Sequence, residues 1–528
     1  MRASLGMALL VTLVGAARAS GQALDERMVP AGRVRLEAHT RFTGWDSRFG
    51  LLPDGTTRQE ALGEDLTDPT SVSLFPGIAS LTSSLEAITG TAGYTPVLGS
   101  TRALVTQDIT RIDWGAHLGV TDWLTIGAVL PWMRTRTALE VVFRPDTLAG
   151  DLGLNPAVAD PGTVAEFLFG VDDAVLAAQA RASQECAAAP GGPGCLDAQA
   201  LAARAATFQS RVDGAYGASA LFPVTGSAMA GALVQAAAAL DADLTAAGLA
   251  GIGAPMAFAA DRLQPAEFAG IPALSASGID AAAGLEDFKG LWQAGDVEVS
   301  ASLRLLEGEK RDSAASRSTL TYRVLAGALV RLPTGTIDHP DIVLDVGTGQ
   351  GQTDWEGWVS GALTAWGRVG LAAGARYGVQ MPRTLVRRVA PPEQLLAPAS
   401  TRSLVRWDPA SYWAIEAAPA LWLTEELAIT GEYHLWRKGR DSYGLATVPP
   451  PTGLDPADLA AESAVTLHQV GLTLRYDTMA RWRRDGATRP LQLYGRWLHA
   501  VNGAGGQVPV TTRVEFGLRL FKRFWGRR

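Results

Sequence analysis

The feature that most limits how this chain can fold is a strict two-residue alternation near its C-terminus. Between Thr512 and Leu520, every second residue is apolar or threonine, and the positions between them carry charge or glycine. Successive side chains of a β-strand point to opposite faces, so this period predicts a strand with one apolar and one charged face. Phe521, Phe524 and Trp525 follow the alternating stretch.

The same alternation recurs along the chain and predicts about twelve strands in total. The other predicted strands are residues 33–42, 111–120, 124–132, 297–305, 322–332, 355–365, 369–377, 413–421, 427–436, 470–476 and 491–497. Only 19% of residues are charged, yet no apolar run is long enough for a spanning helix. Strands that are apolar on one face and polar on the other suit a membrane β-barrel, and an even number places both termini on the periplasmic side. A large soluble α/β enzyme is the alternative that composition alone leaves open.

The connections between these strands alternate in length. Residues 121–122, 366–368 and 424–426 form short turns, and residues 306–320 form a longer polar connection on the same side. The long connections, residues 46–102, 145–296, 333–354, 380–409 and 437–463, fall on the opposite side. Short periplasmic turns and long outer loops are typical of outer-membrane barrels.

The N-terminus has the layout of an export signal. Arg2 precedes a short apolar core at residues 7–16, and small residues follow up to Ala19 and Ala23. We expect residues 1–23 to be a signal peptide that is cleaved after one of these two alanines, with an uncleaved anchor helix as the alternative. The expected location is the outer membrane of a Gram-negative cell, reached through the periplasm.

The connection at residues 145–296 has a different character from the strands around it. It is rich in alanine, and its apolar spacing predicts helices at residues 164–184, 196–212 and 228–247, with a further short helix at residues 77–89. Pro223 and its neighbours argue against a spanning helix within the uncharged stretch 214–240. The expected domains are therefore barrel strands at 24–144, a helical insertion at 145–296 and barrel strands at 297–528.

The chain contains two cysteines, Cys186 and Cys195, both within the helical insertion. In an oxidising compartment they should form one local disulfide. Two free thiols are the alternative.

Tryptophans recur at a spacing that suggests two membrane interfaces. Trp123 and Trp132 are nine residues apart, as are Trp413 and Trp422. At ~3.3 Å per residue this is about 30 Å along a strand, which spans a tilted apolar band of about 25 Å. Scattered core tryptophans are the alternative. The predicted interface aromatics are Trp123, Trp132, Trp413, Trp422, Trp436 and Trp525.

The charged faces of the predicted strands should line the barrel interior. The candidate lumen residues are Arg33, Arg35, Glu37, His39, Arg41, Arg111, Asp113, His117, Glu298, Arg304, Arg323, Arg331, Arg376, Glu416, Glu432, Arg475, Arg496, Arg513, Glu515 and Arg519. Most should pair with one another and fill a narrow barrel. The alternative is an anion-favouring pore, because a ring of arginines attracts anions. Residual positive charge should in either case bias conductance towards anions.

Catalysis is not expected of this chain. His39, His117 and His434 should face the lumen, and none has a serine and an orienting Asn or Asp that can be placed beside it on a lipid-facing patch. Metal-ligand spacing, a dinucleotide fingerprint and a basic patch for nucleic acid are all absent from the sequence. We therefore predict no enzyme activity, no cofactor, no metal and no nucleic-acid partner.

Two motifs resemble those of a known family. Leu332-Pro333-Thr334-Gly335 ends one predicted strand, and the Gly-rich run GTGQGQTD at residues 347–354 leads into the next. The turn VTDW at residues 120–123 precedes LTIG. These features resemble the phenol-degradation meta-pathway outer-membrane family, which is related to fatty-acid and aromatic-hydrocarbon channels. The resemblance covers mainly residues 103–135 and 297–528, and the helical insertion departs from it.

The sequence thus predicts an all-β membrane barrel of about twelve antiparallel strands with a large helical insertion on the outer side. The resemblance implies a porin-like channel or transporter for small molecules, hydrophobic ones included, with the insertion as a plug or cap. The alternative is a surface-exposed binding or assembly protein that uses the barrel as an anchor. The expected partners are outer-membrane lipid, the barrel-assembly machinery and an unidentified small solute.

Overall fold

Twelve long antiparallel strands close into a barrel in the part of the chain that the computed structural model describes, residues 27–52, 54–145, 150–311, 318–391, 394–486 and 489–525. The last strand pairs with the first, as in the register of Arg41 with Glu515, and β5 pairs with β10 to complete the circle. The strands are β1 (Arg33–Trp45), β4 (Ser100–Gly119), β5 (Leu124–Arg144), β10 (Glu298–Arg311), β11 (Ser318–Arg331), β12 (Asp354–Ala365), β13 (Val369–Gln380), β16 (Tyr412–Trp422), β17 (Leu427–Lys438), β19 (Val465–Asp477), β20 (Leu491–Ala504) and β22 (Thr512–Arg523). The predicted fold class is confirmed, whereas the predicted signal peptide lies outside the described residues.

The two-residue alternation explains why these segments form a barrel that crosses a membrane. On β1, the outward Leu36 is 47% exposed, whereas the inward Arg35 and Glu37 are 0% and 6% exposed. The outward residues of the other strands are likewise large and apolar, for example Leu130, Val359, Leu371, Leu472 and Phe516. Closing the barrel pairs every strand edge, so no unpaired backbone faces lipid. The protein is therefore an outer-membrane β-barrel.

Helices do not offer a second way across the membrane. Among the residues that the structure describes, no helix is both long enough and apolar enough to be a membrane span. Residues 221–223, in the uncharged stretch considered above, form the short strand β7 (Leu221–Pro223), which pairs with β6 (Leu152–Leu154).

Inside the barrel, several aromatic side chains lie over a glycine on the neighbouring strand. Gly517 is the register partner of Tyr494, and Gly378 is the partner of Tyr412. A Cβ atom at Gly517 or Gly378 would lie 2.1 or 2.2 Å from the tyrosine ring. Each glycine therefore gives the ring room to lie flat along the inner wall, which fixes the register of the two strands.

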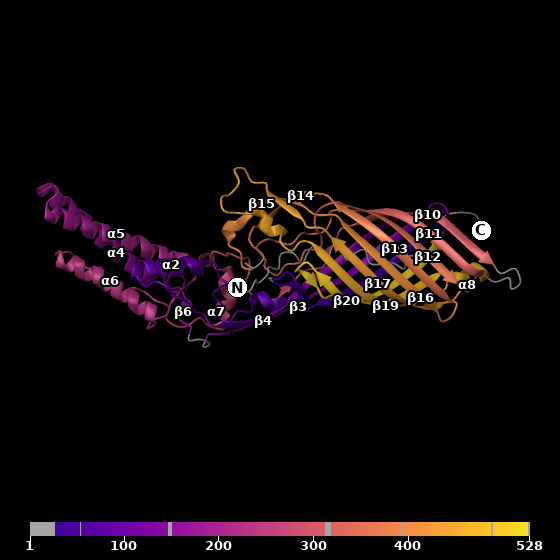
Figure 1. The fold of residues 1–528 in the computed structure, drawn as a ribbon, viewed down its shortest axis with the longest axis horizontal. Coiled ribbons are helices and arrows are strands. Elements are labelled where there is room, and N and C mark those ends of the chain that lie inside the picture. The colour runs from indigo at the N-terminus through magenta and orange to yellow at the C-terminus, as the bar shows by residue number, and fades with distance from the viewer. Residues whose placement is uncertain are drawn as a thin grey trace.

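The two ends of the barrel differ as the connection lengths predict. The strands on one side are joined by tight turns and by the short helix α8 (Met479–Asp485), near which the chain also ends. On the other side, β4 and β5 are longer than the remaining strands and continue past the barrel as an extended hairpin (Figure 1). We take this second side to be extracellular, since both termini of an even-stranded barrel are periplasmic.

The helical insertion stands on this hairpin, beyond the outer end of the barrel (Figure 1). Its helices are α3 (Pro156–Ala159), α4 (Pro161–Ala188), α5 (Pro193–Ala218), α6 (Ala228–Ala246) and α7 (Pro265–Gly270), and α2 (Gly77–Thr89) packs beside them. Apolar residues such as Leu81, Phe167, Val212 and Leu233 form their common core, which Ala103 and Phe143 of the hairpin join. The helices of the insertion thus form a folded unit beyond the outer end of the barrel (Figure 1).

Two details of the sequence determine the shape of the α4–α5 hairpin. Asp160 caps the start of α4 and is followed by a proline, which is favoured in the first helical turn. Cys186 and Cys195 form a disulfide across the turn between the helices. The hairpin is therefore closed covalently at its tip.

Smaller elements fold over the outer mouth of the barrel (Figure 1). One three-stranded sheet contains β2 (Ser47–Leu51), β3 (Thr57–Ala61) and β21 (Val508–Pro509), and a second contains β14 (Arg383–Arg388), β15 (Arg402–Asp408) and β18 (Ser442–Leu445). The short strands β8 (Phe288–Lys289) and β9 (Gln293–Ala294) pair with the outer half of β5. Single turns of 3-10 helix complete the covering, namely η2 (Leu62–Leu66), η4 (Ile271–Ala273), η5 (Ser275–Ser277), η6 (Ala399–Thr401) and η7 (Pro456–Ala460).

Candidate functional site

The inner wall of the barrel carries a belt of alternating charges. On one side, Arg41 Nε lies 3.3 Å from Glu515 and Arg41 Nη2 lies 3.6 Å from Asp113. Asp113 also pairs with Arg111, whose Nη2 lies 3.6 Å from Glu298. These contacts link β22, β1, β4 and β10 through side chains that are nearly all buried.

The belt continues around the opposite wall. Arg331 lies 3.4 Å from Glu298 and 2.8 Å from Asp354. Arg376 pairs with Glu416 and lies 3.7 Å from Glu356. We call these luminal ion-paired residues, together with His434, Glu432 and Arg496, the charge belt.

The remaining links return the charge belt to its start. His434 lies 3.7 Å from Glu416 and 2.8 Å from Glu432, which pairs with Arg496. Arg496 Nη1 then lies 3.8 Å from Glu515. Ion pairs of this density hold the inward side chains of many strands in fixed positions, because each charge is stable when buried only while its partner is present.

A second cluster lies beside the charge belt and centres on one carboxylate. Glu37 lies 3.1 Å from Arg35, 2.9 Å from His117 and 3.3 Å from Arg519. One carboxylate thus binds three neighbours from β1, β4 and β22.

Two acidic residues of the charge belt were missed by the sequence analysis. Asp354 and Glu356 face inward on β12 and are 3% and 4% exposed. Their signal was present, because they alternate with the outward Trp355, but the predicted strand began one residue too late to include Asp354. Together with Glu307, which pairs with Arg304 and Arg323, they reduce the basic excess expected of the lumen.

The segment before β1 also lies inside the barrel. Arg27 stacks on Trp358 of β12 with its guanidinium carbon 3.9 Å from the ring centroid. Val29 N donates to Thr125 Oγ1 at the start of β5. The segment from Arg27 to Val29 therefore lies inside the barrel between β12 and β5, and Arg27 helps to line a cavity of about 90 Å³ beside the charge belt. No pattern in the sequence predicted this position.

The Gly-rich connection between β11 and β12 closes the outer part of the lumen. Leu344 and Val346 pack against the inward Ile109 and Met133, and Thr348 Oγ1 donates to Ala294 O at 2.8 Å. Gly335 and Gly349 approach so closely that a Cβ on either would lie 2.7 Å from the Cα of the other. The LPTG and Gly-rich motifs thus pack closely against each other within one compact connection.

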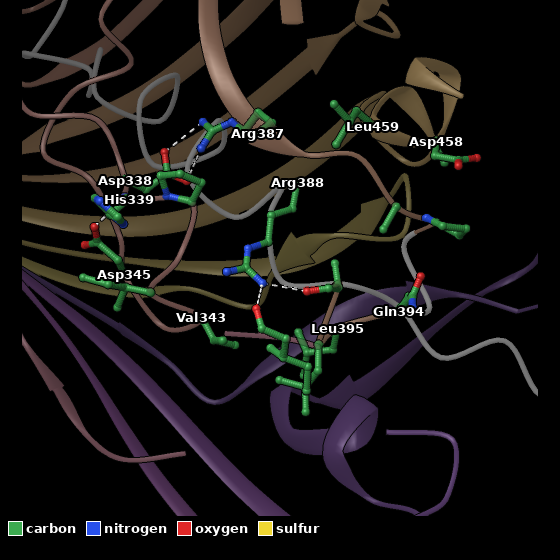
Figure 2. A pocket seen from close by; sticks show the side chains of 18 of the residues that line it. Asp338, His339, Val343, Asp345, Arg387, Arg388, Gln394, Leu395, Asp458 and Leu459 are labelled. Carbon is green, nitrogen blue, oxygen red and sulfur yellow. Dashed lines mark hydrogen bonds and ion pairs between the residues drawn. The ribbon is translucent and has the colours of Figure 1, made fainter. Parts of the chain in front are cut away.

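Above this connection, the outer loops enclose a pocket of about 130 Å³ (Figure 2). Its wall combines residues from β14, from the β11–β12 connection, from η7 and from the end of the helical insertion. Apolar side chains make up much of the lining, including Ile279, Ile342, Leu395, Leu396 and Leu459. Pockets that bind small molecules commonly have this mixture of apolar walls and a few fixed polar groups.

Two arginines of β14 supply the fixed polar groups of this pocket. Arg387 forms a two-pronged pair with Asp338, with Nη2–Oδ1 at 2.8 Å, and Figure 2 shows it turned towards that carboxylate. Arg388 reaches the middle of the pocket, donates to Ala397 O at 2.7 Å and lies 2.8 Å from Asp341. Burial, together with the charge of Asp338, raises the pKa of the Asp345 carboxyl above its usual range.

The structure places all the candidate lumen residues on the inward face of their strands. Most are buried, whereas Arg33, Arg304, Arg323 and Arg475 lie towards the periplasmic ends and are partly exposed. Arg513 is 5% exposed and lies on the same inward face of β22 as Glu515.

Two of the predicted interface aromatics are placed wrongly by the sequence analysis. Trp436 is 6% exposed and packs inside the barrel with Tyr412 and Phe49. Trp422 also faces inward, where the luminal Arg475 lies 5.8 Å from its ring. The physical reason is parity: Trp413 and Trp422 are an odd number of residues apart on one strand, so they cannot share a face. Of the others, Trp123, Trp132 and Trp525 are exposed on the outer surface.

Two of the histidines take part in polar contacts with neighbouring strands. His434 belongs to the charge belt, and His468 bonds with Tyr433 at 2.8 Å on the outer wall. Within the described ranges, no cluster of three or more His, Cys, Asp or Glu side chains has the arrangement of a metal site.

Comparison with known proteins gives similar solved structures. No family model and no curated protein matches the chain. An outer membrane channel from Pseudomonas putida F1 is similar with a TM-score of 0.41 and 8% identity over 94% of this chain and 98% of that one. A FadL homologue from Pseudomonas aeruginosa has a TM-score of 0.26 and 8% identity over 94% and 91% of the two chains. A mutant of the TodX monoaromatic hydrocarbon channel has a TM-score of 0.27 and 9% identity, over 94% of this chain and 91% of that one.

The first and third of these structures are described as channels. The fold is established independently by the strand pairing described above.

Proposed function

We propose that this protein is a narrow outer-membrane channel for small molecules, and that solutes enter it through the pocket of the outer loops. The observation that carries the proposal is this pocket of about 130 Å³, formed by the outer loops at the mouth of the barrel. A barrel that served only as an anchor would need neither an enclosed pocket at its mouth nor a cavity beside the charge belt.

The size of the cavities limits the solute. The pocket of about 130 Å³ and the luminal cavity of about 90 Å³ are each smaller than the ~300 Å³ typical of drug-sized ligand sites. Residues of the Gly-rich connection line the first cavity, and Arg27 lines the second. Passage therefore requires small solutes and a shift of at least one of these segments.

The lining of the pocket favours a solute that is mainly apolar with a polar group at one end. Leu395, Leu396 and Ile342 would hold an apolar body, and Arg388 would hold the polar end. Because Arg388 already bonds with Asp341, a strongly anionic group would have to compete with that carboxylate. A neutral hydroxyl or carbonyl fits this arrangement better than a carboxylate.

Single-channel conductance in planar bilayers tests the proposal. We expect small currents from the unmodified protein and larger ones from the Arg376→Ala/Glu416→Ala variant, which removes a pair of the charge belt without leaving either member alone. The matched control is Arg204→Ala/Asp243→Ala, an ion pair of 3.1 Å on the helical insertion. Currents that are absent in all three proteins would contradict the channel function.

A second function has one observation in its favour. The helical insertion stands clear of the lumen, and Phe169 and Leu176, two turns apart on α4, are 69% and 62% exposed. Exposed apolar side chains on a projecting helix suit contact with a partner. Loss of cell-surface binding of a partner in Phe169→Ser/Leu176→Ser, with unchanged conductance, would favour this function over the channel.

A further inference from the structure

The outward-facing side chains of β5 change from apolar to basic just beyond Trp132. Along the outward face of β5, Trp132 is followed by Arg134 and then Arg136. Tryptophan is favoured at the boundary between acyl chains and headgroups, so the next outward positions lie at the level of the outer-leaflet headgroups. Two arginines are therefore held where the charged part of a lipid would be.

A third cation joins them from the neighbouring strand. Lys289 of β8 is the direct register partner of Arg136, so the two side chains share the outward face. Like charges in directly opposed positions of a sheet repel one another. The sheet thus holds three cations, Arg134, Arg136 and Lys289, in a group that an anion would stabilise.

The local carboxylates only partly balance these cations. Arg136 Nε lies 3.7 Å from Asp108, and Lys289 Nζ lies 3.5 Å from Asp287, which are distances of ion pairs and not of good hydrogen bonds. Arg134 lies over the ring of Trp292 at 5.3 Å. The Nε atoms of Arg134 and Arg136 are buried and have no hydrogen-bond partner within the described part of the chain.

A groove of about 1200 Å³ lies beside these cations at the outer rim of the barrel, and Asp46 and Asp108 are also part of its lining. Arg134, Arg136 and Trp292 line one part of it, and Thr110 and Thr512 add hydroxyl groups. Phe42 and Val514, on the outward faces of β1 and β22, supply an apolar part. The groove therefore has the two-part chemistry of an amphiphile that carries phosphate.

We propose that this groove binds the phosphorylated headgroup of an outer-leaflet glycolipid of the lipid A type, with Arg134 and Arg136 of its lining holding phosphate and Lys289, the register partner of Arg136, beside them. Arginine suits this role because its planar fork matches phosphate oxygens. The acyl chains of the same lipid then lie along Phe42 and Val514. The site is separate from the lumen and does not depend on the channel function.

Native mass spectrometry of the full-length protein in detergent tests the proposal, with lipid A that carries two phosphates as the probe. We expect one bound lipid A per barrel, and affinity roughly thirtyfold lower for Arg134→Gln/Arg136→Gln, because each basic residue near a membrane surface contributes roughly a fivefold change in affinity. The control is Arg483→Gln/Arg523→Gln, which removes two exposed arginines at the periplasmic end. Heat-modified gel migration checks that both variants are folded.

Two further probes separate the possible sources of phosphate. Lipid A with a single phosphate should bind more weakly than the form with two, and millimolar inorganic phosphate should not displace either lipid. Equal affinity of the two double variants for lipid A would overturn the proposal. Displacement of lipid A by inorganic phosphate alone would also overturn it, since the site would then recognise a free anion.

Discussion

At the scale of single residues, the charge belt holds the luminal side chains in place. It also makes the stability of the barrel sensitive to the loss of one member of an ion pair. Arg376 is placed between Glu356 and Glu416, and the side chains of all three are at most 9% exposed. Burying a charge is unfavourable unless a partner is present, so the removal of one member leaves the other stranded. The interior therefore depends on matched pairs more than on any one residue.

This dependence predicts an asymmetry between single and double variants. Arg376→Met should lower the free energy of unfolding by about 3–5 kcal/mol, because Glu416 then remains buried without its main partner. Arg376→Met/Glu416→Gln should recover part of this loss. Urea unfolding in detergent measures both, and equal losses in the two variants would show that the pair does not act as a unit.

One acidic residue of the outer loops should make them sensitive to pH. Burial raises the pKa of Glu462 to about 7, although Gln507 and Arg48 act in the opposite direction and Asp65 and Glu60 add to the rise. A carboxyl with a raised pKa in the folded state binds its proton more tightly than in the unfolded state. Its stabilising contribution is therefore complete below the ordinary value and is lost as pH rises through about 7.

The measurement for Glu462 is hydrogen exchange in residues 456–464 and 505–511. Protection factors there should be higher at pH 5 than at pH 8, and Glu462→Gln should remove the difference. A pH response that persists in Glu462→Gln would assign it to another group, such as Asp345.

At the scale of elements, most of the architecture follows from periodicity. All twelve predicted strands and the four main helices exist, because the alternation of the strands and the alanine-rich spacing of the helices are local properties of the sequence. The ends of the strands were less predictable than their centres. The outer halves of β4 and β5 were not expected, since their pairing depends on each other and on the helical core, and not on a lipid face.

The glycine–aromatic contacts between strands are an element-scale feature that the sequence hides, because the two partners lie far apart or in an unknown register. Gly517→Val should reduce stability by about 1–3 kcal/mol, since Tyr494 must leave its place on the inner wall and overpacking is costly. Gly357→Val is the matched control, because a Cβ at Gly357 meets nothing within 4 Å. Thermal unfolding by heat-modified gel migration compares the two, and equal midpoints would contradict the role of the contact.

The candidate site was likewise predictable from the sequence only in part. The inward face of each strand was predictable, so the luminal charges could be named from the sequence. Their partners could not, since the charge belt depends on which strands are neighbours across the barrel. The loop pocket was beyond sequence reasoning altogether, because Asp338, Arg388 and Leu459 come from three separate connections.

At the scale of the whole molecule, the barrel and the helical insertion should behave as separable parts. Removing residues 177–204 and joining Leu176 to Ala205 with a short glycine–serine turn shortens the α4–α5 hairpin but keeps its packed base. Conductance and the thermal unfolding of the barrel should be unchanged, because the removed part does not contact the lumen. A clear rise in conductance would instead show that the hairpin restricts the pore as a cap.

The length of α4 has a practical consequence for work on living cells. At 1.5 Å per residue its 28 residues extend about 42 Å, and the disulfide-closed turn lies at its far end. A short epitope inserted between Ala189 and Gly192 would therefore be displayed well away from the bilayer, where antibodies, phage tails and flow-cytometry reagents first meet the surface. Bacteria carrying the protein could then be counted and sorted intact, with the transmembrane part of the protein left untouched.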